Sequence, residues 1–121
     1  MMHSRAYIII SLCLGGLLLA SCGKQYTAEQ TVKDFVAENM QDGVETSGVD
    51  FADLGTTRHI NDTLVAKMRK KGDELYKSGI KYGNVPAGEV YYLGMKYLHE
   101  GDTLQNTFYL DSELKEVVAF K

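Results

Sequence analysis

From Glu89 to the C-terminus, apolar and polar residues alternate, and this period of two constrains the fold more than any other feature. The alternation breaks twice, at Glu100-Gly101 and at Asp111–Glu113, where turn-forming residues gather. It therefore predicts three strands, over Val90–Leu98, Thr103–Leu110 and Lys115–Phe120. Short turns between consecutive strands predict an antiparallel meander, and we expect helices to cover its apolar face.

Pairing Leu98 with Thr103 sets the register of the first predicted hairpin. One face then pairs Tyr97 with Leu104, Met95 with Asn106, Leu93 with Phe108, and Tyr91 with Leu110. The other face pairs Lys96 with Gln105, Gly94 with Thr107, and Tyr92 with Tyr109. A slip of one residue would mix polar and apolar groups on both faces, which a half-buried sheet resists.

This register makes the Leu93 face the core, packed on a helix that carries Val32, Phe35 and Val36. Tyr92 and Tyr109 are then a cross-strand aromatic pair on the outer face. We expect any binding surface on the sheet to include both tyrosines, with Lys96 beside them.

Two upstream segments have helical periodicity. Thr27–Gln30 reads as a capping box, which predicts a helix over Ala28–Gln41. Asn61-Asp62 supplies N-cap chemistry for a second helix that ends at Gly79, with one shared face: Leu64, Val65, Met68, Leu75 and Tyr76. Between the helices, the residues from Val49 to Leu54 predict one short strand, and Gly55–Ile60 either continues it or is a loop. The order predicts an α+β fold: helix, short strand, helix, three-stranded meander.

The N-terminus has the pattern of an export signal. Arg5 is the only charged residue among the first 21, and a 14-residue apolar run follows it from Ala6 to Leu19. About 20 apolar residues are needed to span a bilayer, so the run is too short for an anchor. A buried helix is the structural alternative, and the basic flank and the length of the run disfavour it.

The run ends in Leu19-Ala20-Ser21-Cys22, which resembles the lipobox of bacterial lipoproteins. The resemblance implies cleavage before Cys22, a diacylglycerol on its thiol, and an acyl group on its new amine. Cys13 would leave with the signal, so Cys22 would be the single cysteine of the mature chain and no internal disulfide could form. The expected organisation is a signal peptide over 1–21, a lipidated tether over 22–26 and a single α+β domain over 27–121.

Beyond the lipobox, Thr31–Val36 and Thr107–Val118 resemble segments of short lipoproteins of Bacteroides-type bacteria. The element order is similar to that of cystatin-like and nuclear-transport-factor-like (NTF2-like) rolls, in which helices pack on a curved antiparallel sheet. Gly23 after Cys22 favours the outer membrane, and Lys24-Gln25 favours its periplasmic side. Exported proteins of these bacteria are often O-glycosylated after Asp, which makes Thr63 and Thr103 candidate sites.

The chain holds 13 Lys and Arg against 16 Asp and Glu, a net charge of −3, so we expect no nucleic-acid partner. His59 and His99 lack a second ligand at metal-binding spacing, and we expect neither a metal nor a cofactor. A basic cluster either contacts anionic head groups or is a solvated helix face balanced by Asp73 and Glu74; its members are Arg69, Lys70, Lys71, Lys77 and Lys81.

The interpretation that these features favour is a lipid-anchored binding or interaction module of the cell envelope, not an enzyme. Its expected partners are membrane lipid, through acylated Cys22, and an envelope protein or glycan. Two alternatives remain open at this point. One is a small enzyme, with paired carboxylates in a cavity of the roll. The other is a structural envelope component, with a large apolar patch and self-association.

Overall fold

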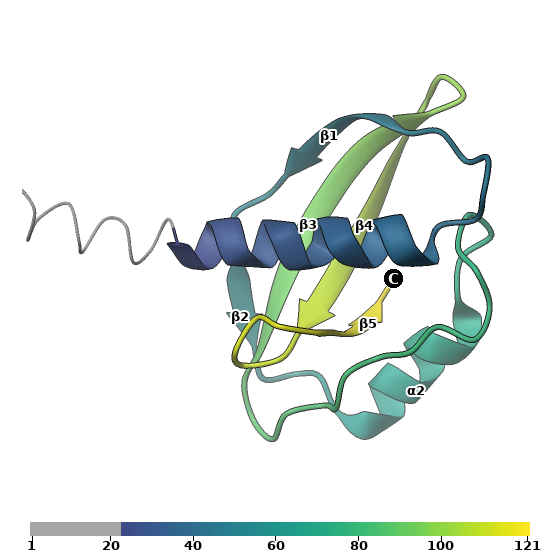
Figure 1. Ribbon diagram of the computed structural model, residues 1–121. Helices are drawn as coiled ribbons and strands as arrows, with labels where there is room; N and C mark the ends of the chain where they lie inside the picture. The colour runs from purple at the N-terminus through teal and green to yellow at the C-terminus, as the bar shows by residue number, and fades with distance from the viewer. Residues whose placement is uncertain (1–22) are drawn as a thin grey trace, which may run out of the picture.

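The β3–β4 hairpin forms the centre of the sheet in the computed structural model, which describes residues 23–121 (Figure 1). The sheet is antiparallel and has five strands, with the order β1-β3-β4-β5 and β2 paired to β3 on the same edge as β1. The elements in chain order are an N-terminal helix (23–39), β1 (Ser47–Phe51), β2 (Gly55–Thr57), α2 (Asp62–Lys71), β3 (Val90–His99), β4 (Asp102–Leu110) and β5 (Val117–Phe120). The α+β class is confirmed, and the expected single short strand is two strands.

The hairpin has the predicted register throughout. Leu98 pairs with Thr103 and Leu93 with Phe108, and the ladder extends to His99 and Asp102. The two residues of the turn, Glu100 and Gly101, have φ values of 50° and 84°. Positive φ at both positions is the geometry of the tight turns that match the twist of a two-strand ribbon.

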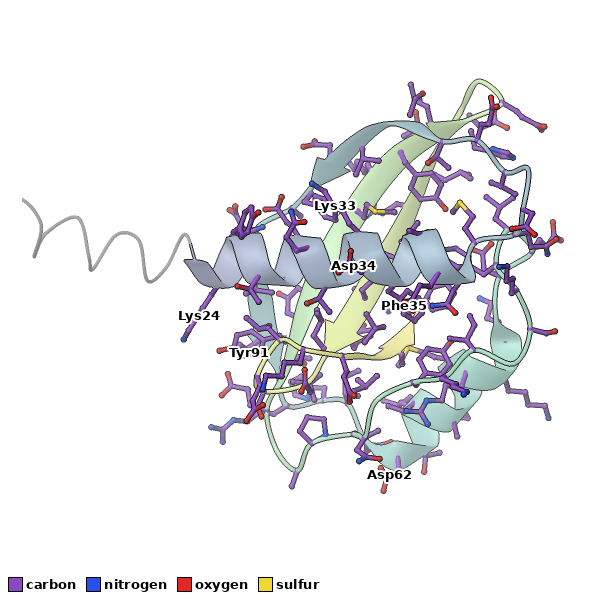
Figure 2. All side chains as sticks on the ribbon, viewed as in Figure 1. Lys24, Lys33, Asp34, Phe35, Asp62 and Tyr91 are labelled. Carbon is purple, nitrogen blue, oxygen red and sulfur yellow. The ribbon has the colours of Figure 1, made fainter. Side chains whose placement is uncertain are left out.

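The Leu93 face is the core, as predicted. Leu93 and Phe108 are fully buried, and the N-terminal helix lies over them with Val32 and Phe35. The Phe35 ring meets Phe108 edge-on at 5.9 Å between ring centroids. Figures 1 and 2 show this helix crossing one face of the sheet, with Lys24 at its free end and Phe35 further along.

The N-terminal helix begins earlier than predicted, within the expected tether. Residues 23–26 are helical, so Thr27 lies inside the helix instead of capping it. The cause is a tertiary contact: the Gln25 amide donates to the Ala52 carbonyl (3.0 Å) and accepts from the Leu54 N–H (2.7 Å). This contact fixes the first turn against the β1–β2 connection. The lipobox, with Cys22, lies outside the described residues.

α2 begins as predicted but ends seven residues early. The Asn61 side chain accepts from the Leu64 N–H at 2.9 Å and caps the helix. Gly72, not Gly79, ends it, with a φ of 59° that residues other than glycine seldom adopt. Tyr76 therefore leaves the helix and packs in the core beneath the N-terminal helix.

The two helices cover opposite faces of the sheet. α2 places Val65 on the outer face, in a second buried cluster with Val90, Tyr109, Val118 and Ala119. The segment 72–89 then passes around the β5 edge, where the Gly83 N–H bonds to the Val117 carbonyl at 3.0 Å. α2 covers only part of the outer face, and the rest is open to a ligand.

Candidate functional site

The uncovered part of the outer face is an open hollow of about 640 Å³, called here the sheet hollow. Its floor comes from β3 and β4, with Tyr92, Gln105 and Thr107 among the lining residues. Its wall comes from the β2–α2 connection and the first turn of α2, which contribute His59 and Leu64. The sheet hollow thus joins residues that lie far apart in the sequence, from Ala52 to Lys121.

Tyr92 is the exposed aromatic residue of the sheet hollow, with 38% of its surface accessible. It pairs with Gly55 across the β2–β3 ladder, and its ring lies where a Cβ on Gly55 would be. Glycine at this position lets the ring lie flat along the strand edge. Leu64 contributes an apolar group that is 40% exposed.

An aromatic ring, an aliphatic group and hydrogen-bonding side chains, with Asp53 and Lys121 also in the lining, together suit a sugar or an extended peptide. The ring and Leu64 supply apolar contact, and the Gln105 amide and Thr107 hydroxyl supply polar partners. The sequence predicted the strand residues from their alternation. The sequence did not predict His59 as part of this site, because no local pattern links its loop to the sheet. It predicted Leu64 on the buried face of its helix, whereas Leu64 is 40% exposed.

Tyr109 needs a correction. It pairs with Tyr92 as predicted, but it is only 7% exposed because α2 packs over it in the Val65 cluster. Tyr109 is therefore part of the floor of the sheet hollow and not an exposed partner of Tyr92. Lys96 is exposed on β3 but does not line the sheet hollow, so the expected surface of three residues reduces to Tyr92 alone.

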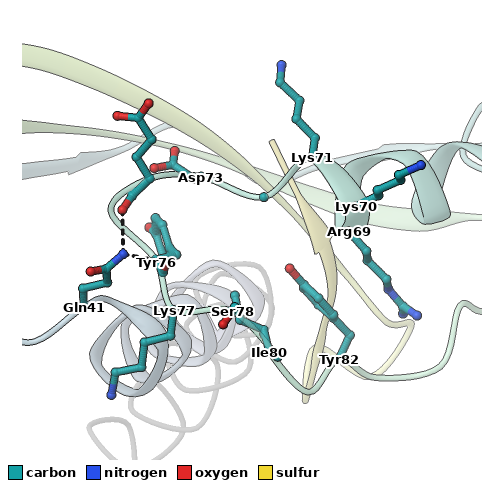
Figure 3. Close-up of a pocket in the computed structure, with 13 residues that line it drawn as sticks. Gln41, Arg69, Lys70, Lys71, Asp73, Tyr76, Lys77, Ser78, Ile80 and Tyr82 are labelled. Atoms are coloured by element: carbon teal, nitrogen blue, oxygen red, sulfur yellow. Dashed lines mark hydrogen bonds between the residues drawn. The ribbon is translucent and has the colours of Figure 1, made fainter.

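A second hollow, of about 700 Å³, lies between the C-terminal turn of α2 and the segment 72–82 (Figure 3). We call it the basic groove because four cations line it: Arg69, Lys70, Lys71 and Lys77. Lys81, the fifth member of the predicted basic cluster, does not line it. The Arg69 guanidinium donates to the carbonyls of Val118 (2.9 Å) and Gly83 (2.8 Å) and lies over the Tyr82 ring.

A buried polar cluster lies behind the basic groove. The Tyr97 hydroxyl donates to Asn106 Oδ1 at 2.6 Å, and Asn106 Nδ2 donates to the Lys121 carbonyl at 3.3 Å. The Tyr76 hydroxyl is buried and has no hydrogen-bond partner among the described residues. Burial raises the pKa of Tyr76, and the nearby Tyr97 and Asp73 raise it further.

The other candidate residues lie apart from both hollows or at their rims. Thr63, in the first turn of α2, and Thr103, in β4, are both exposed. His99 Nδ1 lies 2.9 Å from the Glu45 carbonyl, so this histidine holds the loop that carries Glu45 against the end of β3. Within residues 23–121, no three His, Cys, Asp or Glu side chains gather as metal ligands would.

In the described part of the chain, neither helix is long and apolar enough to cross a membrane. Comparisons of the chain with protein-family models, with curated proteins and with solved structures gave no match. The function therefore has to be argued from the residues themselves.

Proposed function

We propose that this protein is a lipid-anchored binding module of a bacterial cell envelope. The observation that carries the proposal is Leu19-Ala20-Ser21-Cys22 at the end of a 14-residue apolar run. Acylated Cys22 holds the chain in the membrane, because two or more acyl chains give stable binding where one gives only marginal binding. The location that best fits Gly23, Lys24 and Gln25 is the periplasmic side of the outer membrane.

The binding role rests on the sheet hollow. Tyr92 and Leu64 are large apolar residues that the fold leaves 38% and 40% exposed, beside neutral polar groups. Exposed aromatic residues in a concave site are typical of glycan and peptide contacts. A helix across one face of an antiparallel sheet also supports a cystatin-like or NTF2-like roll, and that finer fold assignment is part of this proposal.

Metabolic labelling with a palmitate analogue tests the anchor. We expect the wild-type chain to be labelled and Cys22→Ala to carry no label, because the thiol that accepts the diacylglycerol is gone. Cys13→Ala is the matched control and should be labelled like wild type, since Cys13 lies within the removed signal. Label on Cys22→Ala, or loss of label on Cys13→Ala, would contradict the anchor.

Crosslinking of the lipidated protein in its native envelope tests the binding surface. Tyr92→Ala should abolish a crosslinked partner that Tyr26→Ala retains. Tyr26 is 66% exposed and its change should cost no more than about 0.5 kcal/mol. Tyr92 is 38% exposed and pairs with Tyr109, so Tyr92→Ala should cost about 0.2–1 kcal/mol and leave the domain folded. Equal crosslinking by both variants would show that the sheet hollow does not bind.

A further inference from the structure

The basic groove has a charge opposite in sign to that of the whole chain. Its lining holds four cations but only two carboxylates, Asp73 and Glu74, whereas the chain has a net charge of −3. A concave surface of one charge concentrates ligands of the other. This contrast makes the basic groove a candidate site for an anion.

Of the four cations, only Lys77 has a carboxylate partner among the described residues, since its Nζ lies 3.7 Å from Asp42 Oδ1. Asp73 is turned inward, where Oδ1 accepts from the Leu75 N–H (2.9 Å) and Oδ2 lies 3.5 Å from Asn106 Nδ2. Within the described residues, Lys70 and Lys71 have no carboxylate within the 4.0 Å of an ion pair. Arg69 donates to neutral carbonyls, so these hydrogen bonds do not compensate its positive charge.

The helix dipole explains only part of the arrangement. Cations in the last turn of α2 complement its C-terminal dipole, which accounts for Arg69, Lys70 and Lys71. It does not account for Lys77, which lies on the facing segment, where its N–H bonds to the Asn39 carbonyl at 2.7 Å. The basic groove therefore has cations on both sides.

The walls of the basic groove are held in place before any ligand arrives. Gln41 Nε2 donates to the Glu74 carbonyl (2.8 Å) and the Tyr76 carbonyl (3.3 Å), and these bonds fasten the segment 72–82 to the N-terminal helix (Figure 3). Tyr82 and Ser78 lie between the cations and offer neutral hydroxyl groups. A fixed site of this kind loses little entropy on binding.

We propose that the basic groove binds a phosphate-bearing ligand through Lys70 and Lys71, with the rest of the ligand beside Tyr82 and Ser78. Lysine is a common phosphate partner in proteins, where it acts as a point charge. The aromatic ring and the hydroxyl groups suit the carbon and oxygen atoms of a phosphate ester.

The ligand comes from solution and not from the membrane to which the chain is attached, and this part of the proposal rests on the lipid anchor. Gln41 lines the basic groove, two residues beyond the end of the N-terminal helix, whereas Gly23 follows Cys22 at the other end of that helix. That helix spans 17 residues, or about 25 Å at 1.5 Å per residue. If that helix stands away from the bilayer, head groups lie out of reach of Lys70 and Lys71, and the vesicle experiment below tests this orientation.

Titration of the detergent-solubilised full-length chain with glycerol phosphate tests the site. We expect saturable binding that shifts the amide resonances of Ser78 and Tyr82. Lys70→Glu/Lys71→Glu should weaken it at least about tenfold, and the charge-matched control Lys33→Glu/Lys96→Glu by less than about threefold. Absence of saturable binding, or equal weakening in both variants, would overturn the site. This measurement does not depend on acylation of Cys22.

A second arm distinguishes the two sources of phosphate. The lipidated protein is reconstituted in neutral phosphatidylcholine vesicles and in vesicles that contain phosphatidylglycerol, at about 0.1 M salt, where the screening length is about 10 Å. Glycerol phosphate should bind with the same affinity in both, within about twofold. Weaker binding in the phosphatidylglycerol vesicles would mean that head groups occupy the basic groove, and would overturn a source in solution. Failure of the protein to incorporate at all would instead contradict the lipid anchor.

Discussion

At the scale of single residues, the buried tyrosines differ in what their hydroxyl groups contribute. Tyr97→Phe leaves Asn106 Oδ1 buried without its donor, and we expect the free energy of unfolding to fall by about 1–3 kcal/mol. Tyr76→Phe removes a hydroxyl that has no partner among the described residues, so stability should stay the same or rise. Urea denaturation of both variants measures this. A loss of stability in Tyr76→Phe equal to that in Tyr97→Phe would contradict the cluster as described.

Burial also makes stability depend on pH in the alkaline range. The pKa values of Tyr76, Tyr82 and Tyr97 are raised above 10.0, chiefly by burial, whereas in the unfolded chain these phenols have ordinary pKa values. Above about pH 10 the unfolded chain releases protons that the folded chain retains, so stability falls as pH rises. Tyr76 and Tyr97, which are buried, each contribute up to about 1.4 kcal/mol per pH unit. Tyr76→Phe should flatten this slope in urea titrations, and an unchanged slope would contradict the burial of Tyr76.

The sequence predicts where Asn106 lies in the sheet, but not which groups it hydrogen-bonds to. The hairpin register places Asn106 on the core face opposite Met95, and the structure agrees. Asp73 and the Lys121 carbonyl, which lie near Asn106, come from a loop and from the C-terminus. No local pattern links those positions to β4, so the polar cluster could not be predicted.

At the scale of elements, the β3–β4 hairpin carries the core, and Leu93 tests this directly. Leu93→Ala should lower the free energy of unfolding by about 2–5 kcal/mol, because the side chain is fully buried beneath the N-terminal helix. Leu98→Ala is the control on the same strand: Leu98 is 43% exposed, and its change should cost no more than about 1 kcal/mol. Equal losses in thermal or urea denaturation would contradict the assignment of the two faces.

Patterns local in the sequence predicted the hairpin and the start of α2, and contacts distant in the sequence decided the rest. Alternation, a two-residue turn and an Asn61 cap are each contained in a few consecutive residues. The first turn of the N-terminal helix instead depends on Gln25 reaching Ala52 and Leu54. Tyr109 pairs as predicted, but its burial depends on α2 crossing the outer face, which strand periodicity does not reveal.

At the scale of the whole molecule, the candidate glycosylation sites lie on two different elements and are both accessible. We predict glycan on Thr63 or Thr103 in the native protein, because each follows Asp and each is exposed. Peptide mapping by mass spectrometry should find a sugar mass on a peptide that contains one of these residues. Thr63→Ala/Thr103→Ala should remove that mass, and its persistence would place the modification elsewhere.

The two hollows give the molecule two surfaces with different chemistry. The sheet hollow offers an aromatic ring and polar groups with one carboxylate and one lysine, and the basic groove offers cations at the far end of the N-terminal helix from Gly23. With acylated Cys22 next to that helix, the described domain would stand close to the bilayer. In both proposals of ligand binding, the lipid anchor is what would hold the domain at a membrane of the cell envelope.

Intact-mass spectrometry of the chain extracted from its native membrane tests that anchor most directly. We expect the mass of residues 22–121 plus a diacylglycerol and an amide-linked acyl chain, with any glycan as a separate increment. An unmodified chain that begins at Met1, or a cleaved chain whose Cys22 carries no lipid, would contradict it.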